Sequence, residues 1–265
     1  MSNQYHEYFT YGTVKSCDYG VWISGEESFF APTRDVETVI VPGRNGTLTL
    51  DNGRWNNVEI TYPCYMSGDF LSGYDAFKNA ILTEMRTKAK TELGILLSDT
   101  YHPNVRRYAR CTGGFKPKPG PYNKSAKFDV TFDADPRAFL TSNAYAQYAT
   151  GATISAPTGV YPTINPAKPI IRLEWTSGTG TVTFVINGVS ITVTSPTYKP
   201  FYIDCESQRA FYLTNGNPDR PTYYDDKLTL NDGAFPVLDG QTNSFTYSAS
   251  SDTMKIYINP RWWIL

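Results

Sequence analysis

Residues 38–62, TVIVPGRNGTLTLDNGRWNNVEITY, constrain the fold most, because they hold three short runs rich in β-branched residues separated by two glycine-containing turns. Pro42 ends the first run, since proline brings no backbone N–H to a sheet. Asn45-Gly46 is a strong hairpin signal. We therefore expect residues 47–50 to fold back antiparallel to residues 38–41.

The second turn of this segment is expected at residues 51–53, Asp-Asn-Gly. It leads to residues 58–62, where Val58, Ile60 and Tyr62 fall on one face of a strand. The whole segment predicts a β-meander with one buried side. Arg44 stands on the first turn as a cation that the local fold does not require.

The composition favours an all-β protein with two domains. A chain of 265 residues exceeds what one hydrophobic core usually supports. Its 20 Tyr, 14 Phe, 20 Gly and 18 Pro are typical of aromatic, turn-rich sandwiches. A net charge of −1 argues against a general nucleic-acid binder, which would be strongly basic.

One helix is expected in the first domain, residues 1–139. Ser72 and Asp75 fit a capping box at its start, and helical spacing predicts a span of about 73–90. The apolar stripe of this helix is expected to contain Tyr74, Phe77, Ile81, Leu82 and Met85.

Residues 140–168 are rich in Ala, Thr and Pro and are expected to form a linker. The second domain, 169–265, shows alternating apolar runs joined by Gly and Asn turns, among them Asn187-Gly188. This pattern predicts an antiparallel sandwich. Its strands are expected at 169–176, 181–186, 189–194, 201–204, 209–213, 227–230, 244–247 and 254–258.

A basic stretch without acidic residues runs from Arg106 to Lys127. It is either a basic rim that meets an acidic partner or passing DNA, or a solvated hairpin with its tip at 116–121. The residues of the candidate rim are Arg106, Arg107, Arg110, Lys116 and Lys118.

The sequence offers little for catalysis. Two histidines and four scattered cysteines give no metal-site spacing, and no P-loop, HExxH, GxSxG or dinucleotide motif is present. A glycosidase-like carboxylate pair stays open, because such pairs need not be close in sequence. We expect no enzyme, no cofactor and no metal. We also expect buried, unpaired cysteines.

Exposed aromatic rings are an alternative source of function, because they stack on sugars. Trp175, Trp262, Trp263, Tyr223 and Tyr224 are the candidates. Trp175 is expected in the core. Trp262 and Trp263 are consecutive, so one should face the core while the other stays available.

The N-terminus, MSNQYHEYF, lacks the pattern of a signal peptide, and no run is long enough to span a bilayer. We therefore expect a protein made in the cytosol that has no membrane contact.

Three motifs together resemble the distal tail protein (Dit) family of bacteriophages with long flexible tails. They are VPGRNGTL at 41–48, FDADPRAF at 132–139 and NPRWWIL at 259–265. They touch the start, middle and end of the chain in the family's order. The resemblance implies two β-sandwich domains, the second galectin-like, of the jelly-roll type.

The resemblance also implies a structural role in a virion tail tip. Members of the family form a homo-hexameric ring between the tail tube protein and the tail-associated lysin or spike, and their outer domains attach receptor-binding proteins. No sequence-specific nucleic-acid binding is implied. The alternative is a receptor-binding or carbohydrate-binding sandwich protein at the edge of the tail.

Residues of the three motifs are candidates for the oligomer or partner interface. Arg44 leads this set as a charge on a stiff turn. The full set is Pro42, Gly43, Arg44, Asn45, Gly46, Arg137, Phe139, Arg261, Trp262 and Trp263.

Overall fold

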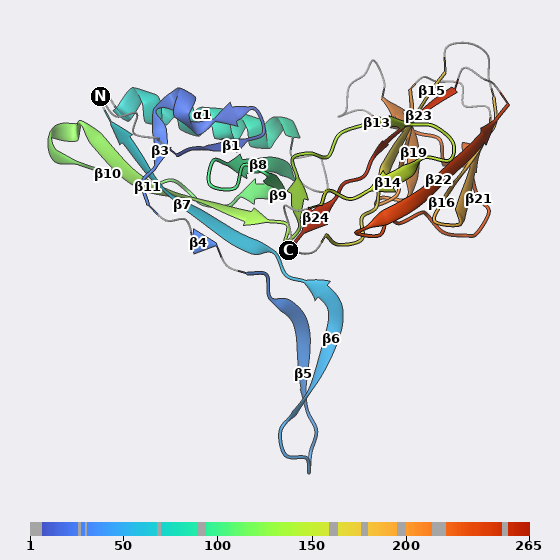
Figure 1. Cartoon of the computed structure of the whole chain (residues 1–265). Coiled ribbons are helices and arrows are strands. Elements are labelled where there is room, and N and C mark those ends of the chain that lie inside the picture. Colours follow the sequence, from blue (N-terminus) through green and yellow to red (C-terminus); the bar gives the residue numbers. More distant parts are fainter. Residues whose placement is uncertain are drawn as a thin grey trace. The chain divides into compact units, whose positions relative to one another are not determined.

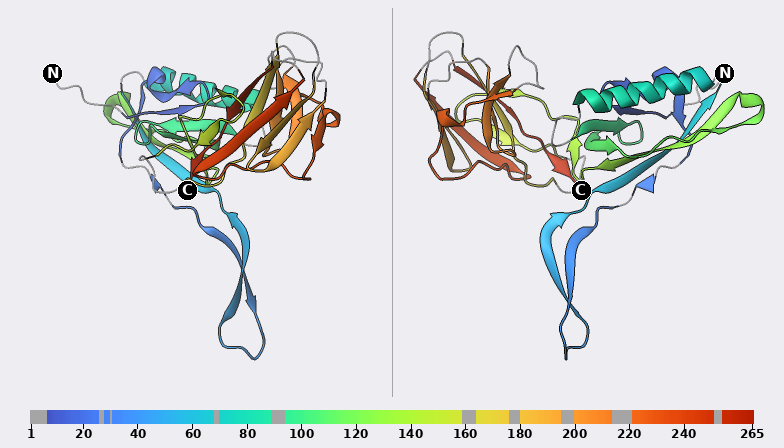
Figure 2. Two further views of the ribbon diagram at one scale, coloured as in Figure 1. Left: turned by 45° about the vertical axis from the view of Figure 1, so that its right-hand side comes forward. Right: turned by 180° about the vertical axis from the view of Figure 1, so that it is seen from behind.

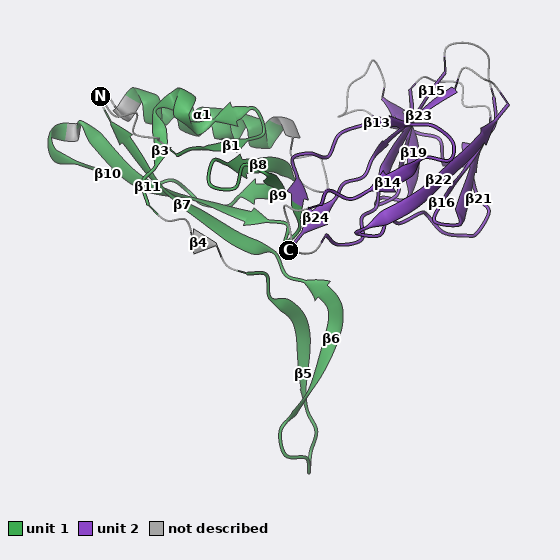
Figure 3. Ribbon diagram, in the orientation of Figure 1, with its two compact units in different colours: residues 1–138, 265 green, residues 139–264 purple. Residues whose placement is uncertain are grey.

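A computed structural model describes residues 7–25, 28–29, 31–67, 70–88, 94–158, 164–175, 180–194, 200–213, 221–250 and 254–265. The chain divides into two units, residues 1–138 with Leu265 and residues 139–264 (Figure 3). The expected class, mainly β with antiparallel sheets and one α-helix, is confirmed.

Among its described residues, the first unit contains the helix and eleven strands before the chain passes into the second unit. Its elements are β1 (Phe9–Tyr11), β2 (Val14–Lys15), η1 (Ser16–Tyr19), β3 (Val21–Ile23), β4 (Ser28–Phe29), β5 (Arg34–Ile40), β6 (Thr47–Trp55), β7 (Val58–Ser67), α1 (Phe70–Lys88), β8 (Ile95–Asp99), β9 (Val105–Cys111), β10 (Lys118–Pro119), η2 (Pro121–Asn123) and β11 (Ser125–Ala134).

The main sheet of the first unit runs in the order β2-β1-β8-β9-β11-β7-β3, with β4 paired to β7 and β10 paired to β11. Its longest pairing joins β7 to β11 over ten residues of each strand, from Ser67 opposite Ser125 to Val58 opposite Ala134. Figure 1 shows the sheet curled, with α1 lying along it.

Aromatic side chains fill the core of this unit. The ring of Phe9 stacks on Tyr62 at 5.0 Å between centroids, and it meets the edges of Phe132 at 5.5 Å and Phe77 at 6.2 Å. Tyr62 comes from the alternating run at 58–62, whose inward residues are buried as expected. The aromatic cluster joins four elements that are far apart in the sequence, which is what gives the unit a single core.

The helix begins earlier than expected. It spans Phe70–Lys88, whereas the sequence predicts 73–90, and residues 89–90 lie outside the described part of the chain. Ser72 is already helical, so the proposed capping box at Ser72 is wrong.

The apolar stripe of α1 is confirmed except at one position. Phe77 and Ile81 are fully buried, and Tyr74 and Met85 pack partly against the same core. Leu82 is 40% exposed, so its assignment to the stripe is wrong. It follows Ile81 by one residue, which on a helix turns its side chain about 100° away from the sheet.

The expected β-meander is also wrong. Strand β6 passes through residues 51–53 without turning, and β5 and β6 form a two-stranded sheet of their own. Gly53 has φ of 76°, but the Asp51 carboxylate accepts its N–H at 2.8 Å, and the chain continues as a strand. The register shifts between Arg34 and Val36, so the glycine serves a bulge instead of a turn.

The second unit is a sandwich of two antiparallel sheets. Its elements are β12 (Ala138–Leu140, which begins at the last residue of the first unit), β13 (Ala146–Tyr148), β14 (Thr153–Ser155), β15 (Ile170–Trp175), β16 (Val182–Ile186), β17 (Val189–Val193), β18 (Phe201–Asp204), β19 (Arg209–Leu213), β20 (Pro221–Tyr223), η4 (Asp225–Lys227), β21 (Leu228–Leu230), β22 (Thr242–Ala249), β23 (Met254–Asn259) and β24 (Trp263–Ile264). One sheet has the order β13-β23-β15-β18-β19-β20, the other β14-β22-β16-β17-β21.

Alternation along these strands places the core between the two sheets, as the sequence predicts. Phe184 and Ile191 from one sheet and Leu173 and Ile203 from the other are fully buried. The Asn187-Gly188 turn joins β16 to β17 with both residues at positive φ, the conformation that this pair favours.

The segment expected to be a linker, 140–168, differs from that expectation in its described part. Strand β13 pairs with β23, and β14 pairs with β22, so both belong to the sheets of the second unit. Ile154 of β14 is fully buried. Burial of a β-branched side chain stabilises this strand although the surrounding sequence is rich in Ala and Thr.

The four cysteines are free thiols, and Cys64, Cys111 and Cys205 are buried. Burial raises the pKa of Cys111 to about 11 and also raises the pKa of Cys64 and Cys205. These thiols therefore stay protonated at neutral pH and behave as small apolar side chains.

We predict that Phe77→Ala lowers the stability of the first unit by about 3–5 kcal/mol, because it removes a fully buried ring from the aromatic cluster. Hydrogen exchange of peptides from β7 and β11 measures this loss for the first unit alone.

Leu82→Ala is the matched control on the same helix and should change stability by no more than about 0.5 kcal/mol. Equal effects of the two substitutions would contradict the placement of α1 on the sheet.

Candidate functional site

The β5–β6 hairpin is the candidate functional site. Figures 1 and 2 show it extending away from the sheet of the first unit. Its register runs from Val36 opposite Asp51 to Ile40 opposite Thr47. The residues from Ile40 to Arg54 are all exposed. Such a ribbon buries little of its own surface, and isolated hairpins are marginal in water.

The turn expected at the tip is present. Gly43 and Gly46 have φ of 80° and 83°, which side chains with a Cβ rarely adopt. The Arg44 backbone N–H donates to the carbonyl of Val41 at 3.2 Å. The hairpin signal in the sequence thus places Arg44 at an exposed tip.

Both faces of the ribbon carry apolar side chains. Val39 lies opposite Leu48, with Leu50 on the same face, and Ile40 and Val36 occupy the other face. Ile40 is 80% exposed. Large apolar side chains gathered on one exposed element are typical of protein–protein contact surfaces.

The sequence predicts these residues as one buried side of a meander, and their exposure is the main correction at the site. A run of alternating residues shows which side chains share a face. It does not show whether another element covers that face. Here none of the described residues does so, since Val36, Ile40, Leu48 and Leu50 are all exposed.

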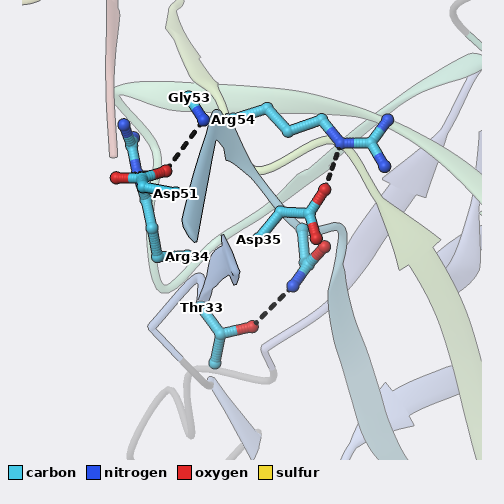
Figure 4. Close-up of polar contacts among 7 residues, drawn as sticks. Thr33, Arg34, Asp35, Asp51, Gly53 and Arg54 are labelled. Carbon is cyan, nitrogen blue, oxygen red and sulfur yellow. Dashed lines mark hydrogen bonds and ion pairs between the residues drawn. The ribbon is translucent and has the colours of Figure 1, made fainter. Parts of the chain in front are cut away.

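Two ion pairs bridge the root of the hairpin in opposite directions, and Figure 4 shows the one between Arg54 and Asp35. The Arg34 Nε of β5 donates to both carboxylate oxygens of Asp51 on β6, each at 2.9 Å. The Arg54 Nε of β6 donates to Asp35 Oδ2 on β5. The Arg34 guanidinium also lies 4.9 Å from the ring centre of Trp55. Together these contacts fix the two strands to each other where they leave the sheet.

The same contacts lower the pKa of both carboxyl groups. For Asp35 the main cause is the hydrogen bond from Arg54. For Asp51 it is the Gly53 backbone N–H, followed by the hydrogen bond from Arg34. Both groups therefore stay ionised, and their bonds intact, well into the acid range.

Arg34, Asp35, Asp51 and Arg54 are site residues that the sequence reasoning missed. The signal was present, because each strand carries one Arg and one Asp near the end that joins the rest of the unit. Cross-strand pairs of opposite charge stabilise a sheet. Only the register shows that these four residues meet.

The other predicted interface residues lie away from the hairpin, and most are buried. Phe139, Arg261 and Trp262 are buried in the second unit. Arg261 donates to Asp204 at 2.8 Å, and its guanidinium carbon lies 6.0 Å from the ring centre of Phe139. These three side chains are therefore packed within the chain, and their role at an interface stays a prediction.

Arg137 and Trp263 are less buried. Arg137 Nη2 donates to Asp135 Oδ2 at 2.8 Å, so its charge is compensated within the chain. Trp263 donates its indole N–H to the carbonyl of Pro166 at 2.8 Å. Trp262 inside and Trp263 partly outside agree with the expected alternation of consecutive residues.

The predicted basic rim does not form one continuous surface. Arg107 is buried and Arg106 half-buried on β9, whereas Arg110, Lys116 and Lys118 are exposed. The arginines and lysines also belong to different parts of the sheet, since β9 and β10 pair with separate portions of β11.

Among the described residues, no three His, Cys, Asp or Glu side chains gather closely enough to hold a metal ion. Within the same residues, no helix has the length and apolar character needed to cross a membrane.

We predict that the root of the hairpin loosens only below pH about 4. Because the folded-state pKa values of Asp35 and Asp51 are lowered, the stabilisation is present above the ordinary carboxyl pKa and is lost as the pH falls through the lowered values. NMR signals of the Gly53 amide and the Trp55 indole should stay unchanged from pH 7 to about 4 and then shift.

The buried Trp175 indole of the second unit is the control signal. Asp51→Asn should give the shifted Gly53 signal at neutral pH already. A midpoint at or above the ordinary aspartate pKa, about 3.9, would contradict the bonded geometry.

Comparisons with known proteins bear on the whole fold. No protein-family model matches the sequence, and no curated protein does. The structure resembles the Dit protein of SPP1, described as a paradigm of the hub adsorption apparatus in Gram-positive infecting phages, with a TM-score of 0.59 and 13% sequence identity over 96% of this chain and 98% of that one. It also resembles a chain of the phage p2 baseplate in its activated conformation with Sr, with a TM-score of 0.52 and 9% identity over 95% and 97% of the two chains. The chain therefore has the fold of a phage Dit protein along nearly its full length.

Proposed function

We propose that this protein is a structural hub of a phage tail tip, which self-associates through the β5–β6 hairpin into a ring. The observation that carries the proposal is the exposed hairpin, apolar on both faces, in a chain with the fold of a Dit protein. The chain has no catalytic role in this proposal.

A second copy of the chain is the occupant that fits the hairpin best. Each exposed apolar side chain gains on the order of 1 kcal/mol when a partner covers it, and Val36, Ile40, Val41, Leu48 and Leu50 act together. The ion pairs at the root keep the two strands from separating, so less ordering is required on binding.

A ring follows from the form of the contact. The hairpin is a convex arm, and its acceptor on the next copy must be a different surface, so the contact is heterologous. Repeated heterologous contacts close into a ring when their rotation allows it, and every copy then gives one hairpin and receives one. We propose six copies, as the resemblance to the Dit family implies.

The proposed partners follow from the same resemblance. The ring would stand between the tail tube protein and the tail-associated lysin or spike, with the second, galectin-like unit attaching receptor-binding proteins. The protein would be made in the host cytoplasm and reside at the virion tail tip. Pro42, Gly43, Arg44, Asn45 and Gly46 at the hairpin tip would contact the neighbouring copy.

We predict that the double variant Leu48→Glu/Leu50→Glu stays monomeric, because it places two charges on one apolar face of the hairpin. Sedimentation velocity and negative-stain electron microscopy of the full chain measure this outcome. Wild-type protein should show six-fold rings with a central hole.

Val237→Glu is the matched control, since Val237 is an exposed apolar residue of the second unit. It should leave the rings intact. Arg44→Glu tests the tip separately, and rings of wild-type stability in that variant would remove Arg44 from the interface. Monomeric wild-type protein at high concentration would overturn the proposal.

A second candidate function, glycan or receptor binding by the second unit, is favoured by a row of side chains on the outer face of its larger sheet. The registers place Tyr257, Arg172, Tyr202, Phe211 and Tyr223 next to one another on five neighbouring strands. Tyr202 and Phe211 stack at 5.4 Å between ring centroids.

Tyr223 at the end of this row is the residue best placed to meet a ligand. It is 50% exposed, and the Arg209 guanidinium carbon lies 3.9 Å from its ring centre. An aromatic ring beside a guanidinium offers an apolar face and hydrogen-bond donors together. Trp175 and Trp262, two other aromatic candidates, are buried and do not take part.

For this second function we predict that immobilised bacterial cell-wall polysaccharides retain the wild-type chain and that Tyr223→Ala is no longer retained, because the exposed ring face is lost. Affinity chromatography on a panel of such polysaccharides is the measurement. Tyr122→Ala, which removes a 93% exposed ring from the first unit, is the control and should be retained. Failure of the whole panel to retain the wild type would exclude this function.

A further inference from the structure

A gap in the main sheet of the first unit lies along β11, between the strands that pair with its two ends. Strand β9 pairs with residues 132–134 of β11, and β10 pairs with residues 126–127. Between them the Thr131 carbonyl accepts the N–H groups of Thr112 and Gly113 at 3.0 and 3.4 Å. Neither register reaches Asp129.

The backbone of Asp129 faces this gap. Alternate residues of a strand direct their N–H and C=O groups to the same side. The carbonyls of Ser125 and Thr131 accept hydrogen bonds from the side of β9 and β10, and Asp129 is in phase with both. On its other side Asp129 lies opposite Pro63 of β7, whose carbonyl faces away from β11 and accepts the Ser24 N–H at 2.7 Å, so β7 does not pair the backbone of Asp129. Among the described residues, the backbone N–H and C=O of Asp129 therefore have no partner and face the gap.

A cleft of about 290 Å³ opens at this position. It is lined by Gly114, Lys116, Lys118, Lys127, Phe128 and Asp129. A Cβ built on Gly114 would meet nothing within 4 Å, so the space beside this residue is open. The cleft is large enough for one or two side chains of a bound segment.

The lining carries a surplus of positive charge. Lys118 and Lys127 lie directly opposite each other in the β10–β11 pairing, an arrangement that destabilises a sheet when both residues have the same charge. Both are exposed, as is Lys116. Three ammonium groups face one carboxylate, that of Asp129, and within the described chain no ion pair compensates the three lysines. An anionic ligand would relieve this repulsion.

We propose that the cleft binds an extended acidic peptide segment of a partner protein. One backbone amide of the segment would pair with the N–H and C=O of Asp129, as in strand addition to a sheet edge. Its carboxylates would lie against Lys116, Lys118 and Lys127. This binding site is separate from the β5–β6 hairpin and does not depend on ring formation.

A peptide fits the cleft better than nucleic acid does. The unpaired edge offers one donor and one acceptor, which match a peptide backbone and not a phosphate chain. The chain as a whole has a net charge of −1, whereas a general nucleic-acid binder is strongly basic. Basic surfaces for nucleic acid usually extend over a whole face of a domain.

The test measures binding of a fluorescein-labelled peptide of alternating Glu and Thr to the full-length chain by fluorescence anisotropy. Lys118→Glu and Gly114→Trp should each weaken binding by about tenfold or more, the first by charge reversal and the second by filling the open space at Gly114. Lys168→Glu, an exposed residue of the second unit, makes the same change in net charge and should leave the affinity within about twofold. Raising the salt from 50 to 500 mM should weaken binding of the wild type.

Three outcomes would overturn the proposal. They are no binding of the Glu-Thr peptide at low salt, equal binding of a Gln-Thr peptide of the same length, and stronger binding of a DNA duplex that the same variants abolish. Far-UV circular dichroism of each variant checks that it is folded. Loss of peptide binding in the monomeric Leu48→Glu/Leu50→Glu variant would also count against the proposal, because the cleft lies within one copy.

Discussion

The pairing of β7 with β11 is the constraint on which the first unit depends. Ten residues of each strand are in register, and their inward side chains carry the aromatic cluster of Tyr62 and Phe132 with Phe9. The β5–β6 hairpin ends immediately before β7. The cleft lined by Lys116, Lys118 and Lys127 lies in the gap along β11. Both proposed binding surfaces are thus attached to the most extensively bonded part of the unit, which holds them in place while their own residues stay exposed.

Local patterns in the sequence predict much of the fold, because alternation and turn chemistry are local. The strands at 201–204 and 209–213 have the predicted bounds, and the Asn-Gly turns at 45–46 and 187–188 both form. The Asp-Asn-Gly at 51–53 looks equally convincing but does not turn. Its conformation depends on the Arg34–Asp51 and Asp35–Arg54 contacts, whose partners are 17 and 19 residues apart in the sequence. No local pattern contains such contacts.

The candidate site was predictable in part for the same reason. The tip with Arg44 follows from its glycines, whereas the exposure of Ile40, Leu48 and Leu50 does not follow from their alternation. Alternation with a period of two residues shows which side chains share a face of a strand. Whether that face is buried is decided by tertiary or quaternary contacts. Leu82 on the helix shows the same limit, since its spacing nearly fits the stripe and only the packed sheet excludes it. Errors of this kind occur where the burial of a side chain depends on contacts with residues distant in sequence or with another chain.

One contact in the second unit has a mechanical consequence. The Asn143 side chain donates to the carbonyl of Trp262 at 2.8 Å and accepts the Trp262 N–H at 2.8 Å, and Leu140 donates to the same carbonyl. These bonds fasten the first residues of the unit to its last. A pulling force applied through the two ends of the unit therefore acts directly on these bonds, because they join the segments at which the force enters.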